Sequence, residues 1–242
     1  MFKIKNEAER ATVYLYGAIG SSWWDDDDNN TAKSFAKTLD SISPKPLDIR
    51  IDSVGGDVHE AFGIASAIQR YEGQTTAYVD GLAASAASYV AVMADKVVMT
   101  DYSQIMIHDA CMMAFGNSEE LMEAAAQLDA TDAMIAAIIA GRSGMDVEDV
   151  RAAMDAETWY DAQDAIEAGL ADEVVRTEKR IAACADPAIL ARFKHAPKAV
   201  IEALSPSDSV EGAGKSHAPN TMQQNEGSRL LVLGNRVYRT KE

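Results

Sequence analysis

Cysteine and basic residues are both scarce in this chain of 242 residues. Only two cysteines occur, Cys111 and Cys184, without the paired spacing of a zinc site or of a secreted disulfide framework. With 22 basic against 38 acidic residues, the formal net charge is -16, which repels phosphate backbones and anionic lipid headgroups. We therefore expect a reducing, cytoplasmic setting and no nucleic-acid partner.

Long apolar runs are also missing. Residues 1–7 are polar and lack the apolar core of a signal peptide, and no later stretch reaches the roughly 18 uncharged apolar residues that span a bilayer. We therefore expect a soluble protein that is neither exported nor held in a membrane. The hydrophobic content of 48% suits one substantial core in a single domain of catalytic size.

Strand-like and helix-like patterns alternate along the first three quarters of the chain, which predicts an α/β fold with a largely parallel sheet. A helix at 118–141 has apolar residues over a wide arc, so we expect it to contribute to a subunit interface. The expected strands are 11–19, 47–51, 75–80, 96–100, 104–108 and 173–175, and the other expected helices are 31–42, 58–68, 146–154 and 162–168.

The composition changes after the last expected strand. Residues 177–204 are typical of one or two amphipathic helices, and the stretch that follows is rich in Ser, Pro, Gly, Asn and Gln, as flexible linkers are. We therefore divide the chain into a domain at 1–176, a helical extension at 177–204, and a flexible linker and tail at 205–242.

A run of small residues at 81–88 lies between an expected strand and an expected helix. Ser85 would project there from a sharp turn, and the helix N-terminus would offer free N–H groups to a developing oxyanion. The same composition also fits simple tight packing of a helix on a strand. The run alone therefore leaves both interpretations open.

Two further segments could carry chemistry. Gly55 and Gly56 follow the second expected strand, where paired glycines can expose backbone N–H groups to an oxyanion and to substrate backbone, or simply make a turn. His108 ends an apolar strand and, being neutral near pH 7, could take a proton from a serine hydroxyl. A lone histidine at a strand end is otherwise often a core residue.

Together the three segments resemble the proteolytic subunit of the Clp protease. Its glycine pair, its Gly-x-Ala-Ala-Ser run and its Met-Ile-His strand recur here in order, 29 residues from Gly56 to Ser85 and 23 from Ser85 to His108. The resemblance extends over about residues 11–175. Residues 81–88 are most similar to the Clp-related head-maturation proteases of tailed phages and prophages.

The resemblance implies a Clp/crotonase-type β-α spiral fold, in which the helix at 118–141 projects as a handle and subunits form rings. It implies that Ser85 attacks a peptide carbonyl, that His108 accepts its proton, and that the N–H groups of Gly56 and Ala86 hold the oxyanion. Gly55 and Gly56 would also bind substrate backbone. Such a site requires no metal and no organic cofactor.

The third triad residue stays open between two carboxylates. The family places an aspartate shortly before an aromatic residue, and the equivalent position is Glu157, 49 residues after His108, with Asp155 as the alternative. Two other departures stand out. Val54 replaces the usual proline, and ten residues precede the first expected strand, fewer than the segment with which the family engages an unfoldase.

The expected function is an ATP-independent serine endopeptidase that processes scaffold or capsid proteins during phage head maturation, in the host bacterial cytoplasm or the prohead interior. The alternatives are a housekeeping peptidase that works with an ATPase, a crotonase-type acyl-CoA enzyme, and a catalytically silent ring subunit that acts as scaffold or adaptor. A serine–lysine dyad through Lys96 is a mechanistic alternative.

Overall fold

The computed structural model describes residues 2–20, 30–42, 44–176, 195, 228–233 and 236–241. The chain divides into two compact units, Met1–Pro206 and Ser207–Glu242. Apart from His195, the helical extension expected at 177–204 lies outside the described residues, and so do residues 205–227 of the linker and tail expected at 205–242.

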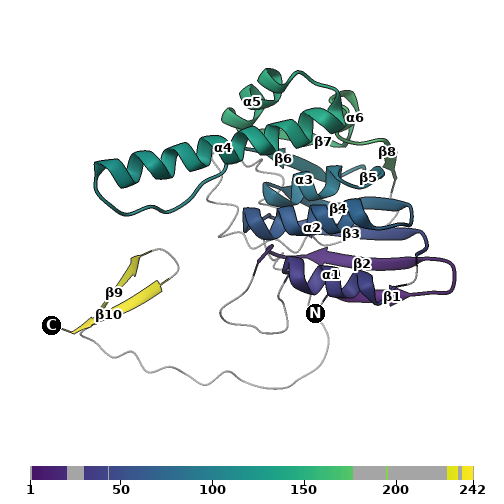
Figure 1. Ribbon diagram of the computed structural model, residues 1–242, viewed down its shortest axis with the longest axis horizontal. Helices are drawn as coiled ribbons and strands as arrows, with labels where there is room; N and C mark the ends of the chain where they lie inside the picture. The colour runs from purple at the N-terminus through teal and green to yellow at the C-terminus, as the bar shows by residue number, and fades with distance from the viewer. Residues whose placement is uncertain are drawn as a thin grey trace, which may run out of the picture. The chain divides into compact units, whose positions relative to one another are not determined.

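An eight-stranded sheet is the centre of the first unit (Figure 1). Most neighbouring strands are parallel, but the first strand is antiparallel to the second and β7 is antiparallel to β6. The α/β class is confirmed, and the sheet is mixed. The main path runs in the order β1 (Lys3–Asn6), β2 (Ala11–Tyr16), β3 (Leu47–Ser53), β4 (Thr75–Ala84), β5 (Lys96–Thr100) and β8 (Glu173–Val175), while β6 (Gln104–Ile107) pairs with β4 and with β7 (Thr158–Asp161).

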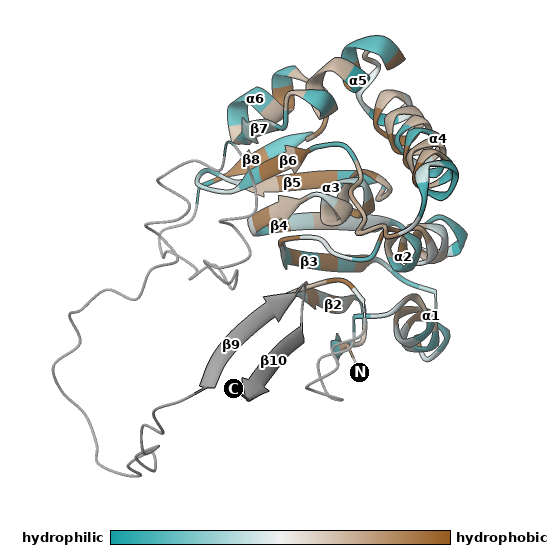
Figure 2. Ribbon diagram, turned by 90° about the vertical axis from the view of Figure 1, so that its left-hand side faces the viewer, coloured by the Kyte–Doolittle hydropathy of each residue, from teal (hydrophilic) through white to brown (hydrophobic). Residues whose placement is uncertain are grey.

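Six helices occur among the described residues, and the first three cover one face of the sheet (Figure 2). Buried residues alternate with half-exposed ones along β2 and β3, as expected for strands with one face against helices. The helices are α1 (Ala32–Asp40), α2 (Val58–Arg70), α3 (Ala86–Val92), α4 (Ser118–Ser143), α5 (Val147–Asp155) and α6 (Ala162–Glu167).

Polar side chains fix where the helices begin. The Thr31 hydroxyl accepts the N–H of Ser34 and so caps α1, as its position before the apolar pattern suggests. Asn117 and Glu120 form a reciprocal capping box at the start of α4, and Gly144 ends that helix in the left-handed region with φ 73°. These caps set the bounds of the 26-residue helix, which ends two residues beyond the predicted end at 141.

The strand β4 changes partners along its length. Residues 76–79 pair with β5, whereas residues 82–84 pair with β6. Its register against β3 shifts between Ile51 and Ser53, so that β4 has two more residues than β3 across this interval. The resulting bulge at Asp80 and Gly81 bends the strand before it reaches Ser85.

The helix α4 projects from the domain as the handle helix that the sequence predicts (Figure 1). Its buried residues all lie in its C-terminal half, namely Asp132, Ile135, Ala136, Ile139 and Ala140. An 18-residue window reaches a mean hydropathy of 1.2, so among the described helices this one is long and apolar enough to cross a membrane. A helix that packs on a second subunit has the same composition, so length and hydropathy do not assign α4 to a membrane.

Large apolar side chains are exposed near the start of α4. We call this group the handle patch, and it consists of Met112, Met113, Phe115, Leu121 and Met122. Phe115 is fully exposed in the loop that precedes the helix. A group of exposed large apolar side chains close together in the sequence is typical of a protein interaction site.

The second unit contains an antiparallel pair of strands, β9 (Ser228–Leu233) and β10 (Arg236–Lys241). Leu233 pairs with Arg236, and Ser228 with Lys241. The sequence predicts a flexible linker and tail at 205–242 and no strand there, so β9 and β10 differ from that prediction.

Candidate active site

Ser85 stands at the sharp turn from β4 into α3. It is the N-cap of α3 with φ 53° and ψ -125°, one of only two non-glycine residues with positive φ in the described part of the chain. Such a backbone conformation is strained for a residue with a side chain, and strain of this kind gathers at functional sites. The Ser85 N–H donates to the Met106 carbonyl at 2.9 Å, which ties the turn to β6.

Ser88 supports this turn. It is buried, and both its N–H and its hydroxyl donate to the Ser85 carbonyl, at 2.9 and 2.6 Å. Its hydroxyl is thus committed to the backbone of the turn, whereas the Ser85 hydroxyl faces a histidine. The structure therefore separates the two serines of the small-residue run by their contacts.

His108 follows the last residue of β6 and contacts Ser85. The Nε2 atom lies 2.8 Å from the Ser85 Oγ, a hydrogen-bond distance. The neighbouring strands carry both residues to the same edge, since Ala84 pairs with Met106 in the β4–β6 ladder. A nucleophile and a base at this distance can exchange a proton directly.

The register of the β6–β7 ladder places Glu157 near the end of β6, which His108 follows. The antiparallel β6–β7 ladder ends with Ile107 opposite Thr158, so His108 and Glu157 are the next residues beyond it. Glu157 has φ 50° and is 9% exposed. Its Oε1 accepts the indole N–H of Trp159 at 3.3 Å and the backbone N–H of His195 at 2.6 Å.

Asp155 has a different environment. It is the last residue of α5 and is exposed. The Asp155 charge acts on the Asp109 carboxyl. Burial raises the pKa of Asp109, and the negative charges of Asp132, Asp155 and Asp129 raise it further. Register therefore aligns Glu157, rather than Asp155, with the strand end that carries His108.

Gly55, the first residue of the glycine pair, lies against the turn that carries Ser85. A Cβ on Gly55 would lie 2.7 Å from the Ala86 nitrogen and 2.8 Å from the Ser85 Cβ, so no larger residue fits without a shift. Gly55 has φ 85°, which also favours glycine. The turn is held without proline at Val54, because the Gly55 N–H donates to the Ser53 hydroxyl at 3.1 Å.

The backbone N–H groups of Gly56 and Ala86 are the candidate donors to an oxyanion. The Ile19 N–H donates to the Gly55 carbonyl, and the Asp57 N–H donates to the Ile19 carbonyl. Because successive N–H groups of an extended chain alternate in direction, the Gly56 N–H points away from Ile19. Ala86 is the first residue of α3, so its N–H has no acceptor within the helix. Both groups could donate to a bound carbonyl oxygen.

Lys96 does not reach the serine. Its ammonium pairs with Glu173, and its backbone pairs with Thr76, nine residues before Ser85 along β4. Because a strand advances about 3.3 Å per residue, these positions are on the order of 30 Å apart. The serine–lysine dyad is therefore excluded. Among the described residues, no group of His, Cys, Asp and Glu side chains could hold a metal ion.

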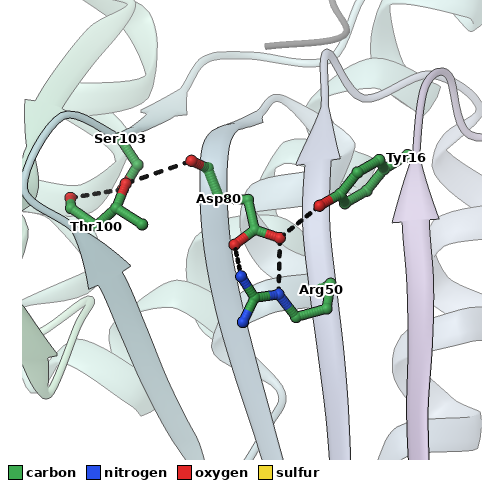
Figure 3. Close-up of polar contacts among 5 residues, drawn as sticks. All are labelled: Tyr16, Arg50, Asp80, Thr100 and Ser103. Atoms are coloured by element: carbon green, nitrogen blue, oxygen red, sulfur yellow. Dashed lines mark hydrogen bonds and ion pairs between the residues drawn. The ribbon is translucent and has the colours of Figure 1, made fainter. Parts of the chain in front are cut away.

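A polar cluster lies beside the bend in β4 (Figure 3). The buried Asp80 carboxylate accepts from Arg50 through both of its oxygens, and from the Tyr16 hydroxyl at 2.6 Å. The Thr100 hydroxyl donates to the Asp80 carbonyl at 3.3 Å. Burial, together with the hydrogen bond to Asp80, raises the pKa of the Tyr16 phenol. These contacts stabilise the part of β4 that leads to Ser85.

Comparison with known proteins identifies the family of this chain. Residues 20–178 match the Clp protease family. The chain is 32% identical over 149 residues to an ATP-dependent Clp protease proteolytic subunit of Bacteroides fragilis, covering 60% of this chain and 72% of the relative. Subunits with the same name are 31% identical over 141 residues in Ligilactobacillus salivarius (57% and 72% covered) and 30% over 145 residues in Porphyromonas gingivalis (59% and 65%).

Proposed function

Because this chain belongs to the Clp protease family, and so to a family of peptidases, we propose that it is a serine endopeptidase with Ser85 as nucleophile and His108 as general base. One observation carries the serine assignment. The Ser85 Oγ lies 2.8 Å from the His108 Nε2 on a strained strand-to-helix turn. This arrangement activates a hydroxyl that would otherwise be a weak nucleophile.

In the proposed mechanism, the Ser85 Oγ attacks the scissile carbonyl while its proton passes to the His108 Nε2. The N–H groups of Gly56 and Ala86 stabilise the oxyanion, and removal of one such donor typically costs about a hundredfold to a thousandfold in rate. His108 then gives its proton to the leaving amine. Glu157 orients the imidazole and stabilises its charged form.

The proposed substrates are protein chains, and the first candidate role is ATP-independent processing of phage scaffold or capsid protein during head maturation. Its support is the similarity of residues 81–88 to the head-maturation branch. The second candidate is a housekeeping peptidase that works with an ATPase, and the names of the relatives, which are ATP-dependent subunits, favour it. Both roles place the protein in a bacterial cytoplasm, and the first also inside the prohead.

Turnover of substrates of two kinds separates the two roles. An ATP-independent processing enzyme should cleave an unstructured protein such as casein at the same rate with and without ATP and a Clp ATPase. A subunit that works with an ATPase should cleave short peptides alone but need the ATPase and ATP for a folded, tagged protein. The outcome assigns the role without changing the assignment of Ser85.

We further propose a homo-oligomeric ring that uses the handle helix α4. The handle patch supports this, because five large apolar side chains exposed on a monomer would be covered in an assembly.

The assignment of Ser85 as the nucleophile is tested by labelling with a fluorophosphonate probe, read by intact mass. Wild type and the Ser88→Ala control should gain one adduct per chain, and Ser85→Ala should gain none. A wild type that takes no label would instead indicate a catalytically silent subunit.

A further inference from the structure

The handle helix carries one buried charge. Asp132 is 5% exposed and lies on the same face as the buried apolar residues Ile135, Ala136 and Ile139. Its Oδ1 accepts the backbone N–H of Ala110 at 2.7 Å. Burial of a carboxylate is unfavourable unless it is well hydrogen-bonded, so this contact accounts for a charge at an otherwise apolar position.

The donor of this bond, the Ala110 N–H, lies two residues after His108, the candidate base. The β6–β7 ladder ends at Ile107, and residues 108–117 have no regular secondary structure. Ala110 still packs against the core, whereas residues 111–117 are exposed. Between Asp109 and Gly116, the bond from Ala110 to Asp132 is the one hydrogen bond to the rest of the domain found among the described residues.

The charge of Asp132 acts on a second carboxyl nearby, that of Asp109. Burial raises the pKa of the Asp109 carboxyl, and the nearby charge of Asp132 adds to that effect before those of Asp155 and Asp129, while Arg151 opposes it. An apolar residue at position 132 would remove this repulsion and extend the apolar face of α4. The hydrogen bond to Ala110 is the contact that only an acceptor can make.

We propose that Asp132 is a positioning residue, which anchors the chain just after His108 and so holds the imidazole in line with the Ser85 hydroxyl. The proposal rests on the proposed serine mechanism. It implies that the base depends on the packing of α4, because Asp132 is the first buried residue of that helix after its projecting half. Packing of the handle helix α4 on another subunit would then favour the alignment of the His108 imidazole with the Ser85 hydroxyl.

The test compares Asp132→Leu, which has no acceptor, with Asp132→Asn, which keeps the Oδ1 acceptor and the shape. Asp129→Leu is the matched control, because Asp129 also lies on α4 and near Asp109 but is exposed. Two measurements are made on each full-length protein. They are amide hydrogen exchange of the peptide that contains Ala110, and steady-state turnover of a short fluorogenic peptide.

We expect Asp132→Leu to speed exchange at Ala110 by about tenfold or more. Its kcat should fall about tenfold to a hundredfold with KM nearly unchanged, because small displacements of a catalytic group are costly in rate. Asp132→Asn should restore both values, and Asp129→Leu should leave both as in the wild type. If Asp132→Leu does not fold, Ala110→Pro removes the same bond from the donor side and should give the same fall in kcat.

Two results would overturn the proposal. One is a folded Asp132→Leu variant with wild-type kcat, and the other is an Asn variant as impaired as the Leu variant. Failure of the proposed function looks different. In that case the wild type is inactive on every peptide, while hydrogen exchange at Ala110 still reports whether Asp132 anchors the chain.

Discussion

Arg50 and Asp80 form an ion pair, and we expect replacement of Arg50 to lower the free energy of unfolding more than replacement of Asp80. Asp80 has no exposed side-chain surface, whereas 28% of the Arg50 side chain is exposed. Arg50→Met leaves a carboxylate without its cation in a site that water does not reach. Asp80→Leu leaves a guanidinium that can turn toward solvent.

The magnitudes follow from these exposures. Breaking a buried pair by removing one partner costs about 3–5 kcal/mol. We expect Arg50→Met to lie near the upper end, at about 4–5 kcal/mol, because Tyr16 alone still hydrogen-bonds to the carboxylate. Asp80→Leu should cost about 2–3 kcal/mol, which is reduced because solvent screens the exposed part of Arg50. The double variant should lie within about 2 kcal/mol of the wild type, since no uncompensated charge remains buried.

Chemical denaturation at one fixed protomer concentration measures these free energies of unfolding, because assembly would otherwise shift them. The Arg50→Met deficit should shrink in acid, where the orphaned carboxylate takes a proton. Equal costs for the two single variants, or a double variant as unstable as the sum of both, would refute the argument from burial. The coupling would then belong to packing rather than to charge.

The remaining predictions concern the site and the assembly. Ser85→Ala and His108→Ala should each lower kcat by at least about 10⁴-fold, and the double variant should be no worse, in a turnover assay with light scattering to show that assembly is intact. Glu157→Gln should lower kcat by up to about 10⁴-fold and Asp155→Asn by less than tenfold, and the reverse order would move the triad to Asp155. Phe115→Glu should shift the oligomer toward smaller species in light scattering, and an unchanged mass would place the subunit contact elsewhere.

The sequence predicts the parts of the site that depend on local pattern. Ser85 stands out because small residues surround it between a strand and a helix, and His108 because it alone ends an apolar strand. The glycine turn is predictable for the same reason, since paired glycines mark a close backbone approach. Each of these signals lies within about eight residues of chain, and the structure brings the segments together.

The rest depends on register between distant segments. The family resemblance points to Glu157, but its register next to the strand end that carries His108 arises only through β7, a four-residue strand that the sequence pattern does not predict. The pairing of Arg50 with Asp80 joins residues 30 positions apart on neighbouring strands, and the contact of Glu157 with His195 joins residues 38 apart. A single sequence carries no local signal for such contacts.

The change of partners along β4 has a consequence for how this protein could change over evolutionary time. The first half of β4 supports β5, and its second half supports β6 and then β7, so one strand feeds two branches. Apart from Thr100, which hydrogen-bonds to Asp80, residues of the β5 branch can be substituted without changing the β6–β7 ladder next to His108 and Glu157. The β6 branch can vary beyond its ladder, where the exposed loop begins. Scaffold stability and the geometry of the candidate site can therefore change separately, so one domain could acquire new substrates while it keeps its candidate catalytic residues.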